Sequence, residues 1–284
     1  MNRRSLAHRS AVATLAFLLV VGSGCADTGA ESAASDEPAA SAATRASSPD
    51  SVPAAILGQA PPPRGEDVHY VPGDSATAGY LVVPEGDGPF PAVILIHEWD
   101  GLNERVRQVA DAFADEGYVA LAADLFEGRT GANREENMAL VQEARANPGA
   151  LIANLNAAVE FLRARDDVTG RVGTMGWCFG GGVALSYALG GEQHDATAMF
   201  YGSLVTDPDS LAALDHEIYG TFAAEDDGIP PDQVEQFVTA LREAGVENDV
   251  HVYDAVDHGF WLWVDQDFEA RSEPALDAWT RLKA

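Results

Sequence analysis

The segment at residues 171–189, RVGTMGWCFGGGVALSYAL, constrains the fold of this chain more than any other feature. Its apolar run at residues 172–175 predicts a buried strand, and apolar residues resume directly after the glycines as a buried helix. Between strand and helix stands Cys178, with Gly176 two residues before it and Gly180 two residues after it. A sharp strand-to-helix turn that presents a nucleophile needs small residues at these two positions. The pattern therefore predicts a nucleophilic Cys178, with a buried structural cysteine as the alternative.

The nucleophile at such a turn is usually a serine, and a cysteine in its place changes the chemistry. A free thiol is only about 3% ionised at pH 7, yet that fraction is a strong nucleophile. A nearby base or a helix N-terminus increases the ionised fraction. A reactive Cys178 therefore needs a base, which is expected at one of the remaining strand ends.

The charge of the chain is strongly acidic. The formal net charge is −28, and Lys283 is the only lysine. Such a surface repels nucleic acid and anionic lipid headgroups, so neither is an expected partner of the folded domain. Because concentrated salt screens mutual repulsion, the composition also suggests a salt-adapted, halophilic protein.

The N-terminal residues 1–24 are typical of an export signal. Arg3 and Arg4 precede an apolar run at residues 11–21 that is too short to cross a bilayer comfortably. Cys25 follows small residues in a pattern that resembles a bacterial lipobox. We therefore expect an exported protein, lipid-anchored through Cys25 to the outer face of the cell membrane or in the periplasm, with the Sec and twin-arginine routes both open.

Residues 25–64 are rich in alanine, serine, proline and acidic residues, which predicts a disordered tether. With one cysteine at the lipobox and one at the turn, no disulfide within the domain is expected. The folded domain is then expected at residues 65–284.

This domain alternates buried strands with amphipathic helices, which predicts the α/β class with a mostly parallel sheet covered by helices on both faces. No metal-ligand spacing such as HExxH is present. The expected strands lie at residues 68–70, 78–83, 90–97, 118–123, 172–175, 196–201, 218–223 and 250–253, and the expected helices lie around residues 106–113, 151–162, 234–241 and 268–282.

The strand ends after the thiol offer a base and an acid that can orient it. His258 follows the last strand in the segment YDAVDHGF, and Asp226 directly follows the strand at residues 218–223. Asp227 is the close competitor of Asp226, and Asp254 and Asp257 lie nearer the histidine in sequence. The order of nucleophile, acid and histidine is the one found on α/β-hydrolase folds.

A fourth element is the HEWDGLN turn at residues 97–103. Glu98 stands there at a strand end that faces the same edge of the sheet, and the loop can supply a backbone N–H to an oxyanion hole. A solvated loop carboxylate is the alternative interpretation.

Together, these residues resemble the dienelactone hydrolase family of α/β-hydrolases over nearly all of residues 65–284. The matching segments are HEWDGLN, DLF at residues 124–126, GWCFGGG, FYG at residues 200–202, EDDGIPP and DHGF. The resemblance implies an α/β-hydrolase fold and needs no cofactor or metal.

Carried over position by position, the resemblance implies a triad of Cys178 as nucleophile, His258 as base and Asp226 as orienting acid. It implies Glu98 as the carboxylate that helps to ionise the thiol. The backbone N–H groups of Trp99 and Phe179 correspond to the oxyanion hole.

The resemblance also suggests substrate contacts at Arg129, Tyr201, Trp261 and Trp263. Family members that bind a carboxylate-bearing dienelactone place an arginine four residues after the histidine, where this chain has Leu262. We therefore expect a more neutral or apolar lactone or ester.

The sequence thus predicts a monomeric hydrolase that cleaves a small lactone or ester through a Cys178 thioester. A membrane-tethered binding protein without significant turnover is the alternative from another class. A thiol-based transferase or a broad esterase with the same acyl-enzyme is the alternative among enzymes.

Overall fold

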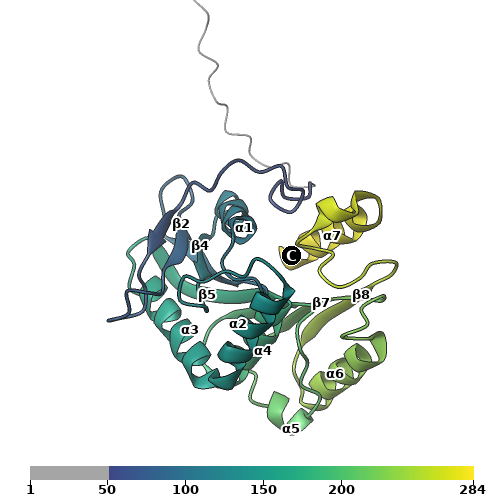
Figure 1. Cartoon of the computed structure of the whole chain (residues 1–284). Helices are drawn as coiled ribbons and strands as arrows, with labels where there is room; N and C mark the ends of the chain where they lie inside the picture. The colour runs from purple at the N-terminus through teal and green to yellow at the C-terminus, as the bar shows by residue number, and fades with distance from the viewer. Residues whose placement is uncertain (1–50) are drawn as a thin grey trace, which may run out of the picture. The chain divides into compact units, whose positions relative to one another are not determined.

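A computed structural model describes residues 51–284, so the predicted export signal, Cys25 and the tether up to residue 50 lie outside the described residues. The described residues form one eight-stranded sheet in the order β1-β2-β4-β3-β5-β6-β7-β8 (Figure 1). The strands are β1 Glu66–Val68, β2 Gly79–Val82, β3 Phe90–Ile96, β4 Val119–Ala123, β5 Val168–Trp177, β6 Ala196–Phe200, β7 Ile218–Ala223 and β8 Asn248–Tyr253.

The sheet is mostly parallel, as the sequence predicts. β1 pairs with β2, and β2 pairs with β4, in antiparallel fashion. Every pairing from β4 to β8 is parallel. The carboxyl ends of β3, β5, β6, β7 and β8 therefore meet at one edge of the sheet, where ligands of open α/β sheets bind.

The helices connect these strands and lie on both faces of the sheet. Within residues 51–284, no helix is both long and apolar enough to cross a bilayer. The helices are α1 Glu104–Asp115, α2 Arg134–Ala146, α3 Pro148–Arg163, α4 Phe179–Gly190, α5 Pro208–Leu211, α6 Pro231–Glu243, the 3₁₀ helix η1 Val264–Gln266 and α7 Phe268–Leu282.

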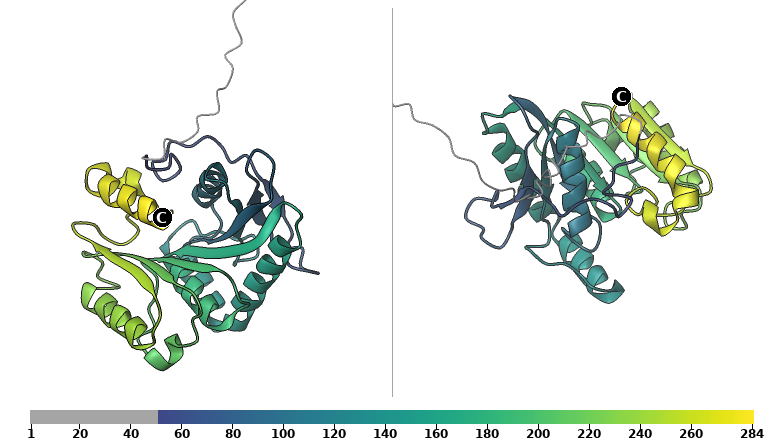
Figure 2. Two further views of the ribbon diagram at one scale, coloured as in Figure 1. Left: turned by 180° about the vertical axis from the view of Figure 1, so that it is seen from behind. Right: turned by 90° about the horizontal axis from the view of Figure 1, so that it is seen from above.

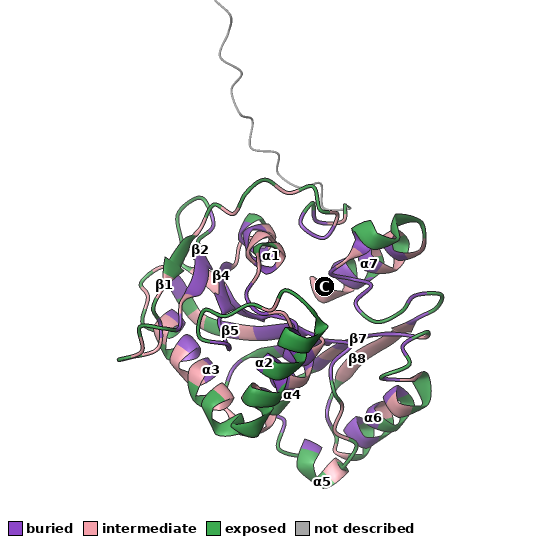
Figure 3. Cartoon of the chain, viewed as in Figure 1, coloured by how far each residue is buried: buried purple, intermediate pink, exposed green. Residues whose placement is uncertain are grey.

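α1 and α7 cover one face of the sheet, and α2, α3, α4 and α6 cover the other (Figures 1 and 2). The apolar core is divided in the same way. One cluster joins α1 and α7 to the sheet, a second joins α2, α3 and α4 to the opposite face, and a third lies under α6. Figure 3 shows the central strands buried between these layers, whereas the edge strands β1 and β8 are more accessible and the outer sides of the helices are exposed.

The HEWDGLN segment becomes the turn that joins β3 to α1. Asn103 caps α1, because its side-chain oxygen accepts a hydrogen bond of 3.1 Å from the backbone N–H of Val106. The Asn103 amide also donates to Asp100 at 2.8 Å. The turn is thus held by its own side chains, which fixes the positions of the residues between Ile96 and α1.

The packed domain begins before the boundary that the sequence predicts at residue 65. Ile56 is fully buried and Ala55 is 2% exposed, and both belong to the cluster beneath α1 and α7. The side chain of Gln108 in α1 donates to the carbonyl of Pro61 at 3.1 Å. The apolar triplet at residues 55–57 is too short to be periodic, so composition alone assigned it to the tether.

Candidate active site

Cys178 occupies the single residue between β5 and α4. Its backbone has φ 54° and ψ −115°, a strained conformation for a residue with a side chain. The Cys178 N–H donates to the carbonyl of Phe200 at 3.0 Å, and its carbonyl accepts from Gly182 at 3.2 Å. These two hydrogen bonds hold the strained turn, and the residue remains partly accessible.

The two flanking glycines are required by close backbone contacts. A Cβ on Gly176 would lie 2.3 Å from the carbonyl oxygen of Gly180, and a Cβ on Gly180 would lie 2.2 Å from that of Ile96. Neither distance leaves room for a methyl group. The glycine spacing read from the sequence thus reflects the near collision of β3, β5 and α4.

His258 pairs with Asp226. The Nδ1 atom of His258 lies 2.6 Å from Oδ2 of Asp226. The other oxygen of Asp226 accepts from the backbone N–H groups of Gly228 at 2.8 Å and Ile229 at 3.2 Å. The Asp226 side chain is 3% exposed, whereas Asp227 faces solvent. Of the two neighbouring acids, Asp226 is the one that contacts the histidine.

The pKa values of this pair follow from its geometry. Burial alone would raise the pKa of Asp226, but the hydrogen bonds with His258 and with the backbone of Gly228 and Ile229 lower it. Burial alone would lower the pKa of His258, but hydrogen bonds with Asp226 and Cys178 raise it to about 10. The His258 side chain is 40% exposed, so solvent reaches this pair. The raised pKa favours the imidazolium form of His258 at neutral pH.

Glu98 is a buried carboxyl at the end of β3. It is 5% exposed, and its Oε2 accepts a hydrogen bond of 2.8 Å from the indole Nε1 of Trp263. Burial raises the pKa of Glu98 to about 7, although the Trp263 hydrogen bond and the charge of His258 act in the opposite direction. A carboxyl with such a pKa can both accept and release a proton at neutral pH.

His97 is a residue that the sequence reasoning did not single out. Its Nδ1 lies 2.6 Å from the carbonyl of Glu98, and its Nε2 accepts the backbone N–H of Leu125 at 3.2 Å. The imidazole thereby orients the peptide bond between Glu98 and Trp99, one of the two expected oxyanion donors. A histidine that directly precedes the turn glutamate was the signal that could have drawn attention to it.

The second expected oxyanion donor, Phe179, is the first residue of α4. A first-turn amide has no acceptor within its own helix. The N–H of Phe179 therefore needs an acceptor from outside α4, at a position next to Cys178 in the chain.

Tyr201 packs against the histidine. It is fully buried, its φ is 38°, and its ring centroid lies 5.0 Å from that of His258. Its hydroxyl accepts from the N–H of Leu262 at 3.3 Å. Burial, with the charges of Glu98 and Cys178, raises the pKa of this hydroxyl well above its ordinary value. Tyr201 is therefore an uncharged side chain that packs against His258 and lies near Glu98 and Cys178.

The two tryptophans for which substrate contacts were predicted have different surroundings. Trp261 is fully buried in the core, with its ring stacked on Trp177 at a centroid distance of 5.6 Å. Trp263 is half-buried and contacts Glu98. Only Trp263 thus lies beside a reactive group.

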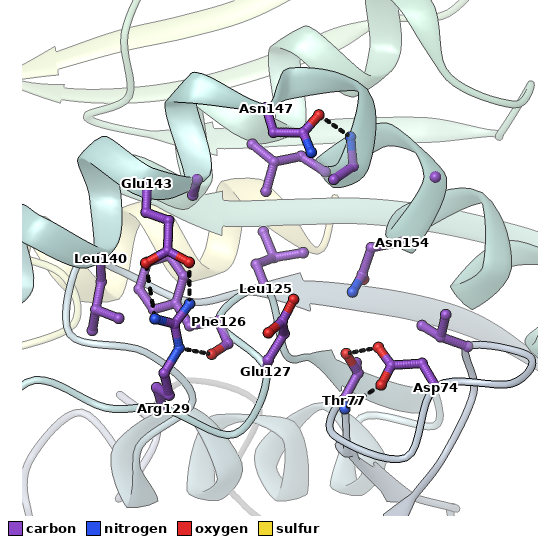
Figure 4. Close-up of a pocket in the computed structure, with 15 residues that line it drawn as sticks. Asp74, Thr77, Leu125, Phe126, Glu127, Arg129, Leu140, Glu143, Asn147 and Asn154 are labelled. Carbon is purple, nitrogen blue, oxygen red and sulfur yellow. Dashed lines mark hydrogen bonds and ion pairs between the residues drawn. The ribbon is translucent and has the colours of Figure 1, made fainter.

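The structure does not bring Arg129 to the thiol. Its guanidinium donates to both oxygens of Glu143, at 2.8 and 2.9 Å (Figure 4). It lines a cavity of about 340 Å³ together with Asp74 and Asn154, and none of the four reactive residues lines that cavity. The predicted contact between Arg129 and a substrate at Cys178 therefore has no geometric support.

The described residues contain no group of three or more histidine, cysteine or acidic side chains that could hold a metal ion. The reactive groups that do gather are a thiol, an imidazole and two carboxyls at the carboxyl ends of parallel strands. Fold and site together define an α/β-hydrolase with cysteine at the nucleophile position.

The comparisons specify the family. The model of the Dienelactone hydrolase family matches residues 77–284. A protein from Synechocystis sp. named "Putative carboxymethylenebutenolidase" is 32% identical over 72% of this chain and 89% of its own length. One of the same name from Methylorubrum extorquens is 30% identical over 74% of this chain and 76% of its own length. The chain belongs to the dienelactone hydrolase family and is a hydrolase.

A solved structure supports the same assignment. The crystal structure titled "Putative Dienelactone Hydrolase" from Klebsiella pneumoniae has a TM-score of 0.67 and 26% sequence identity. The similarity covers 77% of this chain and 96% of that one. The predicted fold class and family are thus confirmed.

Proposed function

We propose that this chain hydrolyses neutral lactones or carboxylic esters through a thioester formed on Cys178. The observation that carries the proposal is the strained Cys178 turn together with His258, whose Nδ1 lies 2.6 Å from the buried carboxylate of Asp226. The influence of Cys178 on the pKa of His258 supports a role of the imidazole as base for the thiol, with Asp226 as the group that orients it.

In the first half of the reaction, the Cys178 thiolate attacks the carbonyl carbon of the substrate. The resulting oxyanion accepts hydrogen bonds from the backbone N–H groups of Trp99 and Phe179, each of which typically contributes about 3 to 4 kcal/mol. His258 then donates its proton to the leaving alkoxide oxygen. The carbon–oxygen bond breaks and a thioester remains.

In the second half, His258 accepts a proton from water as the water oxygen attacks the thioester carbonyl. The second tetrahedral intermediate expels the thiolate and releases the carboxylic acid. Glu98 takes up the thiol proton in the resting enzyme, because its raised pKa lets it exchange protons near neutral pH. Every proton in the cycle thus has a donor and an acceptor at the site.

The charges around the site favour a neutral substrate. Arg105 is paired with Asp265 at 2.8 Å, and Arg271 is paired with Asp257 at 2.7 Å. Leu262, which stands where family members carry an arginine, is fully buried. The charge of an anionic substrate near Glu98 would thus not be offset by Arg105 or Arg271, because each already pairs with an aspartate.

The names of the relatives support a lactone or ester as the substrate class. Nothing in the comparisons supports the alternative of a membrane-tethered binding protein. Export and lipid anchoring at Cys25 remain proposals from the N-terminal sequence alone.

The test is hydrolysis of a panel of lactones and activated esters by the full chain in high salt. Each neutral ester is paired with one of equal length that ends in a carboxylate. We expect the neutral member to be preferred, and Cys178→Ser and His258→Ala each to lower kcat/KM by a factor of about 10³ or more. Equal activity of folded wild-type and variant proteins would refute the proposal.

A further inference from the structure

Trp263 is held in place from several directions. Its indole edge donates to Glu98, while the guanidinium carbon of Arg105 lies 4.6 Å from the ring centroid, over the face of the ring. Arg105 belongs to α1 and donates to both carboxylate oxygens of Asp265, at 3.1 and 2.8 Å. The ring orientation is therefore fixed by a cation that is itself anchored at a second point.

The backbone around Trp263 is also fixed. Arg271 of α7 donates to the Trp263 carbonyl at 2.8 Å. The preceding residue, Leu262, donates its N–H to the hydroxyl of Tyr201, and its carbonyl accepts from Arg105 at 3.4 Å. Because both the ring and the main chain on either side of it are held, the indole N–H points toward Glu98.

The choice of a tryptophan as the partner of Glu98 has a chemical consequence. An arginine in contact with a buried carboxyl would keep it ionised through the attraction of opposite charges. An indole N–H is neutral and is a donor only, so it can bond to the carboxylate and, more weakly, to the carbonyl oxygen of the protonated acid. Glu98 can therefore gain and lose a proton without losing its partner.

We propose, on the basis of the proposed function above, that Trp263 is a positioning residue that holds the Glu98 carboxyl in its reactive place through both protonation states. It does not contact the reacting atoms itself. Its role is to keep Glu98 able to take the thiol proton at neutral pH.

The ionisable groups that face Glu98 come from each element around it: Asp100 in its own turn, Arg105 of α1, Tyr201 after β6 and His258 after β8. Asp100 raises the pKa of Glu98, and His258 and Arg105 lower it. The Trp263 hydrogen bond also lowers it, so its removal should raise the pKa of Glu98.

The test variant is Trp263→Phe, which retains an aromatic ring beneath Arg105 and removes the N–H. We expect kcat/KM for a neutral ester to fall about tenfold at pH 6, in line with the loss of one hydrogen bond to a charged group. Part of the loss should be recovered by pH 9, because Glu98 is then ionised in both proteins, and the part that remains reports the lost position of the carboxylate. A defect unrelated to Glu98 would lower the rate by the same factor at every pH.

Trp261→Phe is the matched control. Trp261 lies two residues away, and its buried Nε1 has no hydrogen-bond partner within residues 51–284. Its replacement should leave the midpoint of the acidic limb of the pH profile where it is in the wild type, whatever its effect on stability.

Infrared difference spectroscopy gives a readout that does not depend on turnover. The band of the protonated Glu98 carboxyl, assigned through Glu98→Gln, should titrate at higher pH in Trp263→Phe than in the wild type. An unchanged titration and an unchanged acidic limb in Trp263→Phe, or equal shifts in Trp261→Phe, would overturn the inference. A wild type without esterase activity would refute the proposed function, while the infrared titration would still decide the role of Trp263.

Discussion

The indole Nε1 of Trp263 lies 2.8 Å from a carboxylate oxygen of Glu98, a residue 165 positions away in the sequence. This contact joins the turn after β3 to the loop after β8, which also carries His258. The loop thus carries both the imidazole that pairs with Asp226 and the indole that donates to Glu98. The site is assembled from separate strand ends, and its geometry depends on how these loops meet.

Replacement of Asp226 tests the orientation of the histidine. Asp226→Asn removes the carboxylate that raises the pKa of His258, so that pKa should fall and less imidazolium should be present at neutral pH. We expect kcat/KM to fall by a factor of about 10² to 10⁴ and the alkaline limb of its pH profile to move to lower pH.

The control is Asp227→Asn at the exposed neighbour. It should retain kcat/KM within about twofold, since surface changes away from contacts have small effects. Equal losses in both variants would contradict the assignment of Asp226.

Much of the fold could be predicted from local pattern. β7 at Ile218–Ala223 and α7 at Phe268–Leu282 have the bounds expected from the sequence, because their apolar residues are either continuous or helically spaced. α2 escaped notice because only Asn137, Leu140 and Val141 of its 13 residues are buried, which leaves little periodic signal.

The site was predictable as a set of residues but not in its contacts. Asp226 and Asp227 are adjacent in sequence, and the choice depends on a turn whose N–H groups hold Asp226. Arg129 looked available in sequence, yet folding brings Glu143 to its guanidinium. The placement of Arg105 over Trp263 depends on the packing of α1 against a distant loop, which no local pattern encodes.

The close approach at Gly180 predicts a severe effect of added volume. Gly180→Ala should destabilise the chain by about 3 kcal/mol or more, because its Cβ would overlap the carbonyls of Ile96 and His97. Gly190→Ala is the control, since a Cβ there meets nothing within 4 Å. Urea denaturation of both variants measures the difference, and similar midpoints would show that the turn can relax.

The packing of Ile56 predicts that residues before 65 stabilise the domain. Ile56→Ala should lower the free energy of unfolding by about 2 to 5 kcal/mol, the usual cost of such a truncation in a core. Gln59→Ala, at an exposed position of the same segment, should change it by less than about 0.5 kcal/mol. If thermal denaturation found Ile56→Ala as stable as the wild type, the segment would not belong to the core.

The burial of His97 leads us to expect that the free energy of unfolding depends on pH. Burial lowers its pKa, and a proton on Nε2 would oppose the N–H of Leu125. The unfolded chain therefore takes up a proton near pH 6.5 before the folded chain does, and stability falls as pH decreases below about 6.5, by at most about 1.4 kcal/mol per pH unit.

Other groups with shifted pKa values act on the same curve. His194 is buried and has a lowered pKa, so it adds to the fall, whereas the raised pKa of Glu98 opposes it. The comparison of wild type with His97→Gln isolates the histidine. The variant should be less stable at pH 8 and lose less stability between pH 7 and pH 5, and parallel curves would contradict the role given to His97.

Acyl transfer through Cys178 can be followed by mass spectrometry of the full chain, quenched in acid during turnover of an activated neutral ester. Such substrates acylate rapidly, so the acyl-enzyme accumulates. Peptide mapping separates Cys178 from Cys25, the other cysteine of the sequence. We expect one acyl group on the Cys178 peptide and neither adduct nor turnover in folded Cys178→Ala. Full turnover by Cys178→Ala would show that the reaction does not pass through this thiol.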